Sequence, residues 1–418
     1  MTELEAKVDR LVSDFDHFSP TFVAGTDTSS FAYHVYRVMR DSHPVLHSER
    51  YGGFYAVTRY EDVYDVLHDH ATFSSAGGIT IPPLVGDLFK IPPFEFDPPE
   101  HTRYRNLLTK GLAPKAVVEF KPFIRERASE AIESALSKGT CDIVSDIIVP
   151  VHGSVIARLL GARPEEYPLF TERVWRLIEG SHLALTTDDG WQSLVEVAAE
   201  IWQHLEELAE MAAVHASDGE DDNSITAAVV SEEQSGMLTR EEVIGLLFAI
   251  YTAGNETTIN ALGSQVHYLY HHEAVAEELR SSPVLIERFV EEMLRYEGPV
   301  QALCRTATRD VVIRGQTIPA GSKVLVYFAA ANRDERQFES PGEVVIQRSP
   351  NRHAALGLGI HRCVGSHLAR LEAITVLDEF LSKVGRFRLD LPNISWRHHE
   401  TRGPSALPAV LERRYAEG

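Results

Sequence analysis

Residues 354–370 read AALGLGIHRCVGSHLAR and contain Cys363, one of three cysteines in the chain. Gly357, Gly359 and Gly365 surround this cysteine, and glycines let a backbone approach a flat ligand closely. We expect a helix to begin near Gly365, which would place its positive end beside the sulfur and lower the pKa of the Cys363 thiol. The stretch therefore predicts a thiolate ligand in a glycine-rich loop.

Other interpretations of the cysteine and of nearby motifs stay open at this level. A lone cysteine is usually a buried, inert side chain. A zinc site is disfavoured because no second cysteine lies at CxxC spacing. His267 and His271, four apart on a predicted helix, could form half of a metal site, but no third ligand is evident.

A second unusual stretch predicts a long helix. Thr239 followed by Glu242 forms a capping-box start, and no proline interrupts the pattern that follows. A helix over about residues 240–271 would be roughly 45 Å long. Its apolar run VIGLLFAIYTA gives way to the polar run GNETT, which is costly in a buried helix. Either Glu256 reaches the surface, or the polar run opens the helix at a site where Glu256 and Thr257 handle protons.

Three weaker signals lie elsewhere. Glu292 and Arg295 are three apart on a predicted helix, so they share a face and can pair. His101 and Arg105 lie one helical turn apart, and Arg305 begins a β-branched segment; each could direct a donor at a carboxylate. Taken singly, an exposed ion pair or a surface arginine is commonplace.

Helical periodicity dominates the chain, and strand signals are short. Patterns favour helices over 122–138 and 191–215, strands over 53–58 and 305–326, an irregular loop over 76–99 and an acidic surface loop over 217–224. The predicted class is mainly α with a minor antiparallel β portion.

Composition narrows the class of protein. Of 418 residues, 44% are hydrophobic and 24% charged, as in soluble globular proteins. No uncharged apolar run is long enough to span a membrane, and the acidic N-terminus is unlike a secretory signal. Three cysteines exclude a disulfide framework and favour a cytoplasmic protein. A net charge of −21 argues against sequence-independent nucleic-acid binding and is read as a solubility feature.

In their order, these motifs resemble those of the bacterial cytochrome P450 family, and the resemblance covers nearly the whole chain. The family patterns FxxGxHxCxG, AGx(D/E)TT and ExxR are matched by Leu356–Gly359–His361–Cys363–Gly365, Ala253–Gly254–Glu256–Thr257–Thr258 and Glu292–Arg295. DPPEHTRYR resembles the haem-propionate helix and AANRD the turn after the sheet. Two departures stand out: Leu356 replaces phenylalanine beside the cysteine, and Val344 replaces the aromatic of PxxF.

The resemblance implies a triangular, helix-rich single domain over residues 1–418, with a long central helix and β-rich parts near 50–60 and 305–328. It implies a haem b whose iron is ligated by Cys363. His101, Arg105, Arg305 and His361 would hold the propionates, and Glu256 and Thr257 would relay protons. Ala249 and Ala253 would leave room for dioxygen and substrate, and Glu292–Arg295 would brace the cysteine loop.

The implied activity is oxygen insertion into a C–H bond of a small hydrophobic substrate, or oxidative dealkylation or epoxidation. Electrons would come from NAD(P)H through a reductase and a ferredoxin, because no reductase is fused before Gly418. An acidic ferredoxin would dock on a basic patch formed by Arg103, Lys110, Lys115, Arg352, Arg362 and Arg370. A peroxide-driven enzyme and a haem sensor or carrier are alternatives; the retained Glu256–Thr257 pair disfavours both.

The substrate pocket is expected to be apolar and to lack a polar anchor. Its walls would come from the loop 76–96 with its phenylalanines, from residues 299–303 and from the dipeptide near the C-terminus. The phenylalanines are Phe89, Phe94 and Phe96, and the dipeptide is Ser405–Ala406. A terpenoid, a small aromatic or a polyketide-like molecule would fit.

Overall fold

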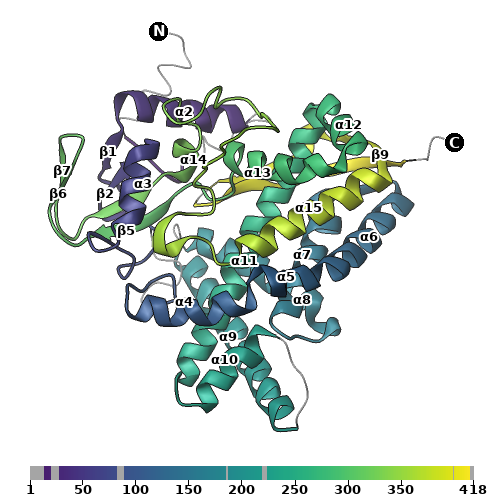
Figure 1. The fold of residues 1–418 in the computed structure, drawn as a ribbon, viewed down its shortest axis with the longest axis horizontal. Helices are drawn as coiled ribbons and strands as arrows, with labels where there is room; N and C mark the ends of the chain where they lie inside the picture. Colours follow the sequence, from purple (N-terminus) through teal and green to yellow (C-terminus); the bar gives the residue numbers. More distant parts are fainter. Residues whose placement is uncertain are drawn as a thin grey trace.

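A computed structural model of the chain describes residues 14–19, 28–81, 89–184, 187–218, 224–398 and 400–414. Helices form most of it, with small sheets at one side and near the C-terminal end (Figure 1). The mainly α class with a minor β portion is therefore confirmed. Within the described residues, no helix is both long enough and apolar enough to cross a membrane.

The α-helices surround one long helix. Their bounds are α2 Thr28–Ser42, α3 Tyr60–His68, α4 Glu100–Gly111, α5 Pro114–Val117, α6 Lys121–Lys138, α7 Val149–Leu159, α8 Tyr167–Leu183, α9 Asp188–Asp218, α10 Ile225–Gln234, α11 Arg240–His271, α12 Glu273–Ser281, α13 Ile286–Tyr296, α14 Phe328–Ala331 and α15 Ser366–Lys383. The expected helix over 122–138 is α6, and the one over 191–215 is α9, which is longer at both ends.

The strands form four small sheets. Their bounds are β1 Val45–Ser48, β2 Phe54–Val57, β3 Phe73–Ser74, β4 Thr140–Asp142, β5 Leu303–Ala307, β6 Val311–Ile313, β7 Gln316–Ile318, β8 Lys323–Val326, β9 Val384–Leu389, β10 Ser395–His398, β11 Arg402–Ala406 and β12 Pro408–Arg413. The largest sheet has the order β1-β2-β8-β5-β3, in which only the β2–β8 pairing is parallel. The C-terminal strands β9 to β12 were not predicted.

Strand alternation explains how this sheet is buried on both faces. Along β8 and just beyond it, Leu325 and Tyr327 belong to one hydrophobic cluster, and Val324 and Val326 belong to another. Successive side chains of a strand point to opposite faces, so each face supplies a core of its own. A third, larger core joins the helices around α11.

Helix α11 has the bounds predicted for it. Thr239 caps it: the Glu242 N–H donates to Thr239 Oγ1 at 3.3 Å, and the Thr239 N–H donates to Glu242 Oε2 at 2.9 Å. The helix crosses the centre of the molecule (Figure 1) and packs against α7, α8, α9, α13 and α15. Its polar run does not open it, because the helix continues unbroken through Glu256 and Thr257. That expectation was wrong; burial by neighbouring helices keeps the backbone bonds intact.

The two expected loops are partly described. Residues 76–81 and 89–99 form neither helix nor strand, as predicted. Helix α9 continues through Asp218, and Ser224 caps α10 by accepting from the Ala227 N–H at 3.1 Å. The middle of each expected loop, 82–88 and 219–223, lies outside the described residues.

Candidate active site

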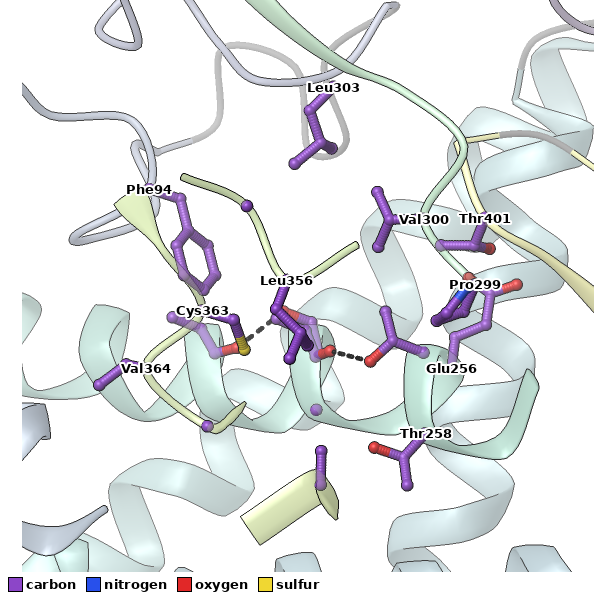
Figure 2. A pocket seen from close by; sticks show the side chains of 18 of the residues that line it. Phe94, Glu256, Thr258, Pro299, Val300, Leu303, Leu356, Cys363, Val364 and Thr401 are labelled. Carbon is purple, nitrogen blue, oxygen red and sulfur yellow. Dashed lines mark hydrogen bonds between the residues drawn. The ribbon is translucent and has the colours of Figure 1, made fainter. Parts of the chain in front are cut away.

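A cavity of about 390 Å³ lies between α11 and the loop that carries Cys363. Figure 2 shows the Cys363 sulfur beside α11, with Phe94 and Leu356 near it and Leu303 farther away across the pocket. Most of the lining is aliphatic or aromatic, and only a few polar groups reach it. A largely apolar pocket with a few convergent polar groups is the usual form of a small-molecule site.

Two glycines of the cysteine loop adopt a backbone conformation, or a close contact, that other residues cannot adopt without strain. Gly357 and Gly359 adopt φ values of 69° and 64°, which favour glycine. A Cβ on Gly359 would lie 2.1 Å from the carbonyl oxygen of Leu67, so no other residue fits there. The Cys363 N–H donates to the Leu356 carbonyl at 2.7 Å. The sulfur is uncovered toward the cavity, and α15 begins three residues later, as expected.

The expected lowering of the Cys363 pKa was wrong for the protein alone. Burial raises the pKa of this thiol, and the opposing effects of the Gly365 N–H and of Arg105, Arg370 and Arg362 are smaller. Desolvation disfavours a thiolate unless a cation pairs with it. A metal at the sulfur would supply that cation.

Three cationic or donor side chains gather beside the cavity, and two of them, Arg305 and His361, line it. The His101 and His361 rings are 4.3 Å apart between centroids. Both nitrogens of His101 and Nε2 of His361 are buried with no hydrogen-bond partner among the described residues. Arg305 is 5% exposed, and its one protein hydrogen bond in the described part of the chain goes to the carbonyl of Cys304, at 2.7 Å.

The pKa values of these groups reflect buried positive charge. Burial, together with the neighbouring cations, lowers the pKa of His101 to about 4 and that of His361 to about 2. Burial also lowers the pKa of Arg305 to about 10. Such a cluster is unfavourable unless an anion binds to it. Arg105 is placed differently, because its guanidinium donates to the carbonyl of Arg362 in the cysteine loop.

The residues present fit a haem. Two propionates would satisfy the unpartnered nitrogens of His101 and His361 and pair with the buried Arg305. The sulfur of Cys363 opens to the cavity that Arg305 and His361 line. The donor set therefore matches a flat, dianionic group with a thiolate ligand.

Glu256 and Thr257 of the polar run of α11 line the cavity, so Glu256 points into the molecule and not to its outer surface. Its Oε1 atom is buried and has no hydrogen-bond partner among the described residues. Thr257 Oγ1 donates to the Ala253 carbonyl at 3.1 Å. Ala249, Ala253, Glu256 and Thr257 all line the cavity. Burial raises the pKa of Glu256, against the lowering effects of Thr401 and Arg397.

The Glu292–Arg295 pair is buried and forms a brace. Arg295 donates to both carboxylate oxygens of Glu292, at 2.8 and 2.9 Å. Its other bonds reach the carbonyls of residues 332, 341 and 343, at 2.7 to 3.0 Å. Glu292 also accepts from the Val345 N–H at 2.9 Å and from Arg348. The pair joins α13 to the segment that leads to the cysteine loop.

The pocket walls match the expectation only in part. Phe94 and residues 299, 300 and 303 line the cavity. Phe89 packs instead on Trp202 and Phe248, and Phe96 on Tyr104, so both rings belong to the core. The C-terminal contribution comes from Glu400 and Thr401 rather than from the expected Ser405–Ala406.

Sequence reasoning missed Glu400, and no local pattern marks it. It lies in a polar stretch, WRHHETRG, that looks like an exposed turn. The metal interpretation of His267 and His271 is not supported: within the described ranges, no group of three or more potential ligands forms a metal site. His267 packs on Trp396, with ring centroids 5.2 Å apart.

Comparison with known proteins gives consistent matches. A family model described as cytochrome P450 matches residues 283–404. The chain is 30% identical to cytochrome P450 130 of Mycobacterium tuberculosis, over 90% of this chain and 93% of that protein. It is 30% identical to a steroid C26-monooxygenase of Mycolicibacterium smegmatis, over 91% and 92%. A solved structure of the Bacillus subtilis bacillaene polyketide synthase cytochrome P450 superposes with a TM-score of 0.84, at 26% identity over 95% and 100%.

Proposed function

The chain belongs to the cytochrome P450 family and is a haem-thiolate monooxygenase, and we propose that Cys363 ligates the iron of a haem b. The observation that carries this proposal is the open Cys363 sulfur in a cavity lined by His361 and Arg305, with unpartnered nitrogens on His361 and on the adjacent His101. A bound haem supplies dioxygen activation and transfer of one oxygen atom, and thiolate ligation favours that chemistry.

We propose that His101, His361 and Arg305 bind the propionates, with Arg105 beside them. Bidentate and charge-assisted bonds to carboxylates suit a guanidinium. Arg105 also holds the cysteine loop through the Arg362 carbonyl, so it would fix the thiolate relative to the propionates. Glu292 and Arg295 would keep the preceding segment in place without contacting substrate.

We propose that Glu256 and Thr257 deliver protons, and that Ala249 and Ala253 leave space for dioxygen and substrate. The Thr257 hydroxyl now donates to a helix carbonyl, and it can turn to donate into the cavity. Burial raises the pKa of Glu256, which is the direction that suits a proton donor.

Thr257→Val should uncouple electron consumption from product formation, while Thr257→Ser should retain coupling. The matched control is Thr252→Val, since Thr252 makes the same kind of helix bond, to the Phe248 carbonyl at 2.9 Å. We expect a roughly tenfold loss of coupling for the first variant alone. The measurement is the amount of product formed per NAD(P)H consumed. Equal losses of coupling in both valine variants would contradict a proton relay through Thr257.

The remaining features of the proposal concern partners and setting. We propose a single working domain over residues 1–418, a cytoplasmic location, and a small hydrophobic substrate. Electrons would come from NAD(P)H through a reductase and an acidic ferredoxin. The apolar lining and the exposed cations near the cysteine loop support the substrate and partner assignments.

Carbon monoxide added to the reduced, purified protein tests the central assignment. We expect the absorption band typical of thiolate ligation in the wild type, and its replacement by the histidine type in Cys363→His. Cys141→Ser is the matched control, because Cys141 lies in β4 and does not line the cavity. A histidine-type band in the wild type, or a purified protein without haem, would refute the proposal.

A further inference from the structure

We propose that Glu400, with Glu256 beside it, is an anionic anchor for substrate, and that the substrate is a hydrophobic molecule carrying a basic amine. The inference rests on the proposed function, since it places that substrate in the same cavity. It replaces the expectation of a pocket without a polar anchor.

Glu400 is held in a fixed position by backbone bonds. It lies in the turn between β10 and β11, and the neighbouring residue Thr401 pairs with Val300 in an antiparallel bridge. The Gln301 N–H donates to the Glu400 carbonyl at 2.6 Å, and the Arg402 N–H donates to the carbonyl of residue 299 at 2.7 Å. Three consecutive residues of the turn are therefore tied to the cavity wall.

The turn also packs closely on α11. Gly403 has no room for a side chain, because a Cβ there would lie 2.4 Å from the Cβ of Asn260. Asn260 is one helical turn after Glu256. Figure 2 shows the Glu256 side chain directed toward Pro299 and Thr401, the two sides of this bridge. Glu400 and Glu256 both line the cavity, so two carboxyl groups meet where the turn covers the helix.

Neither carboxyl group forms an ion pair with a described side chain, although the charge of Arg397 acts on Glu256. In the described part of the chain, Glu400 and Glu256 form no ion pair, and the Oε1 atom of Glu256 lacks any hydrogen bond. The nearby Arg402 is engaged by Glu297. Arg397 lies over the Trp175 ring, at 4.0 Å from its centroid. Buried acids without a cation are costly, so the pocket is electrostatically complementary to a bound cation.

The ionisation of these groups agrees with the geometry. Burial, helped by the neighbouring Glu256, raises the pKa of Glu400 to about 8, against the lowering effect of the Ile81 N–H. A bound cation would favour the carboxylate form through the attraction of opposite charges. An anionic substrate would be repelled, and an uncharged one would gain no such attraction. The apolar wall around Phe94, Val300 and Leu303 would hold the rest of the molecule.

A third carboxyl group at the cavity provides the contrast. Glu95 also lines the wall and is 7% exposed, but its Oε2 accepts from the Ile91 N–H at 2.9 Å. Burial raises the pKa of Glu95, and Lys90 and Lys323 oppose that rise. Because two cations of the protein already act on Glu95, it serves as the matched control for Glu400.

Three probes of one shape test the anchor on the haem-loaded protein: phenylbutyl trimethylammonium, its neutral tert-butyl counterpart, and phenylpentanoate. The quaternary nitrogen has no lone pair, so it cannot ligate iron. Dissociation constants come from calorimetry and from the ligand-induced spin shift. We expect the cation to bind roughly tenfold tighter than the neutral probe and the carboxylate probe to bind weakest.

Substitutions at Glu400 and Glu95 test which carboxyl group causes the tighter binding of the cationic probe. Glu400→Gln should abolish the roughly tenfold advantage of the cation and leave the neutral probe unchanged. Glu400→Asp should restore part of it, and Glu95→Gln should leave it intact. Equal affinities in the wild type, or a preference that survives Glu400→Gln, would overturn the anchor. Unchanged cation affinity with slower turnover in Glu400→Gln would also overturn it and indicate a proton donor instead. A wild type without the thiolate carbon monoxide band would refute the proposed function instead.

Discussion

At the scale of single residues, the site is defined by groups that the protein leaves unsatisfied. Most buried polar atoms in proteins have a partner. In the described part of the chain, both nitrogens of His101 and Nε2 of His361 have none, and the Arg305 guanidinium bonds only to its own neighbour. The Oε1 atom of Glu256 repeats the pattern with the opposite charge, and Glu400 lies beside it with backbone N–H bonds but no ion pair. The first set fits an anionic cofactor, and the second fits a cationic substrate.

Arg305→Leu should weaken haem retention. It removes a buried, charge-assisted donor worth ~1.5–3 kcal/mol, so haem should leave roughly ten to a hundred times faster. Transfer of haem to a scavenging protein measures that rate. Arg309→Leu is the control, because Arg309 lies on the same segment and donates to the Thr72 hydroxyl at 3.0 Å. Equal rates for the two variants would show that Arg305 does not hold the cofactor.

The raised pKa of Glu400 predicts a pH dependence of stability. Glu400 titrates at about 8 in the folded protein and at its ordinary 4.5 when unfolded. The folded state therefore binds more protons between these values, and its stability falls as pH rises through that window. Glu400→Gln should remove this loss and stabilise the protein at pH ~8.5 by on the order of 2–4 kcal/mol, with little effect at pH ~4.5.

Thermal unfolding of the two proteins across this pH range measures the effect. Other groups that act on or near Glu400 are Glu256, Tyr51, Tyr327 and Cys304. The pKa values of both tyrosines and of Cys304 are raised, the last to about 11, mainly by burial, so none titrates in the window. A variant that gains the same stability at pH ~4.5 as at pH ~8.5 would contradict the assignment.

At the scale of elements, buried pairs hold distant segments together. Helix α13 is tied through Glu292–Arg295 to residues 332–348, and Glu291 on the same helix binds Arg370 of α15 at 2.7 Å. Along the chain, the first link reaches a segment before the cysteine loop, and the second reaches a residue after it. Val344, which departs from the family pattern, packs against the main core. The position of the cysteine loop therefore depends on the bonds that tie its two flanking segments to α13.

Glu292→Ala should destabilise the fold and the cysteine loop together. It leaves Arg295 buried and unpaired, which costs about 3–5 kcal/mol. The midpoint of urea unfolding and the haem content of the purified protein measure the two effects. Glu287→Ala is the matched control on the exposed face of the same helix. If the urea midpoints of both variants equal that of the wild type, the brace does not contribute to stability.

At the scale of the whole molecule, the expected basic patch has fewer free cations than the sequence predicted, because some of them pair with acidic side chains. Arg103 pairs with Glu242, and Arg370 with Glu291. Lys110 on α4 is exposed and lies 3.9 Å from Glu232. Lys115 on α5, Arg352 before the cysteine loop and Arg362 within it are exposed as well. Arg105 joins α4 to the cysteine loop, because its guanidinium donates to the Arg362 carbonyl. Any docking surface there is a local exception to a net charge of −21.

The double variant Lys110→Glu, Arg362→Glu should slow electron transfer from an acidic ferredoxin. Steering by complementary charge acts mainly on association, so we expect a roughly tenfold loss at low salt and a smaller one at high salt. Ferredoxin-supported reduction of the haem measures it. Arg388→Glu, on exposed β9, is the control. A loss independent of salt, or an equal loss in the control, would count against docking at this surface.

Much of the site could be predicted because its motifs are local. The capping box of Thr239, the glycines around Cys363 and the three-residue spacing of Glu292–Arg295 act within one turn or loop. Their geometry follows from backbone preferences and helix periodicity. That is why α11 has its predicted bounds and Cys363 precedes α15 as expected.

Only the tertiary structure decided which distant residues meet. His101, Arg305 and His361 are separated by up to 260 residues, and packing of α4, β5 and the cysteine loop brings their donors together. Burial reversed the expected direction of the Cys363 pKa and moved Phe89 and Phe96 into the core. The β10–β11 turn brought Glu400, which has no sequence signature, against α11. Desolvation and charge proximity depend on the complete packing, whereas spacing along a helix or loop does not.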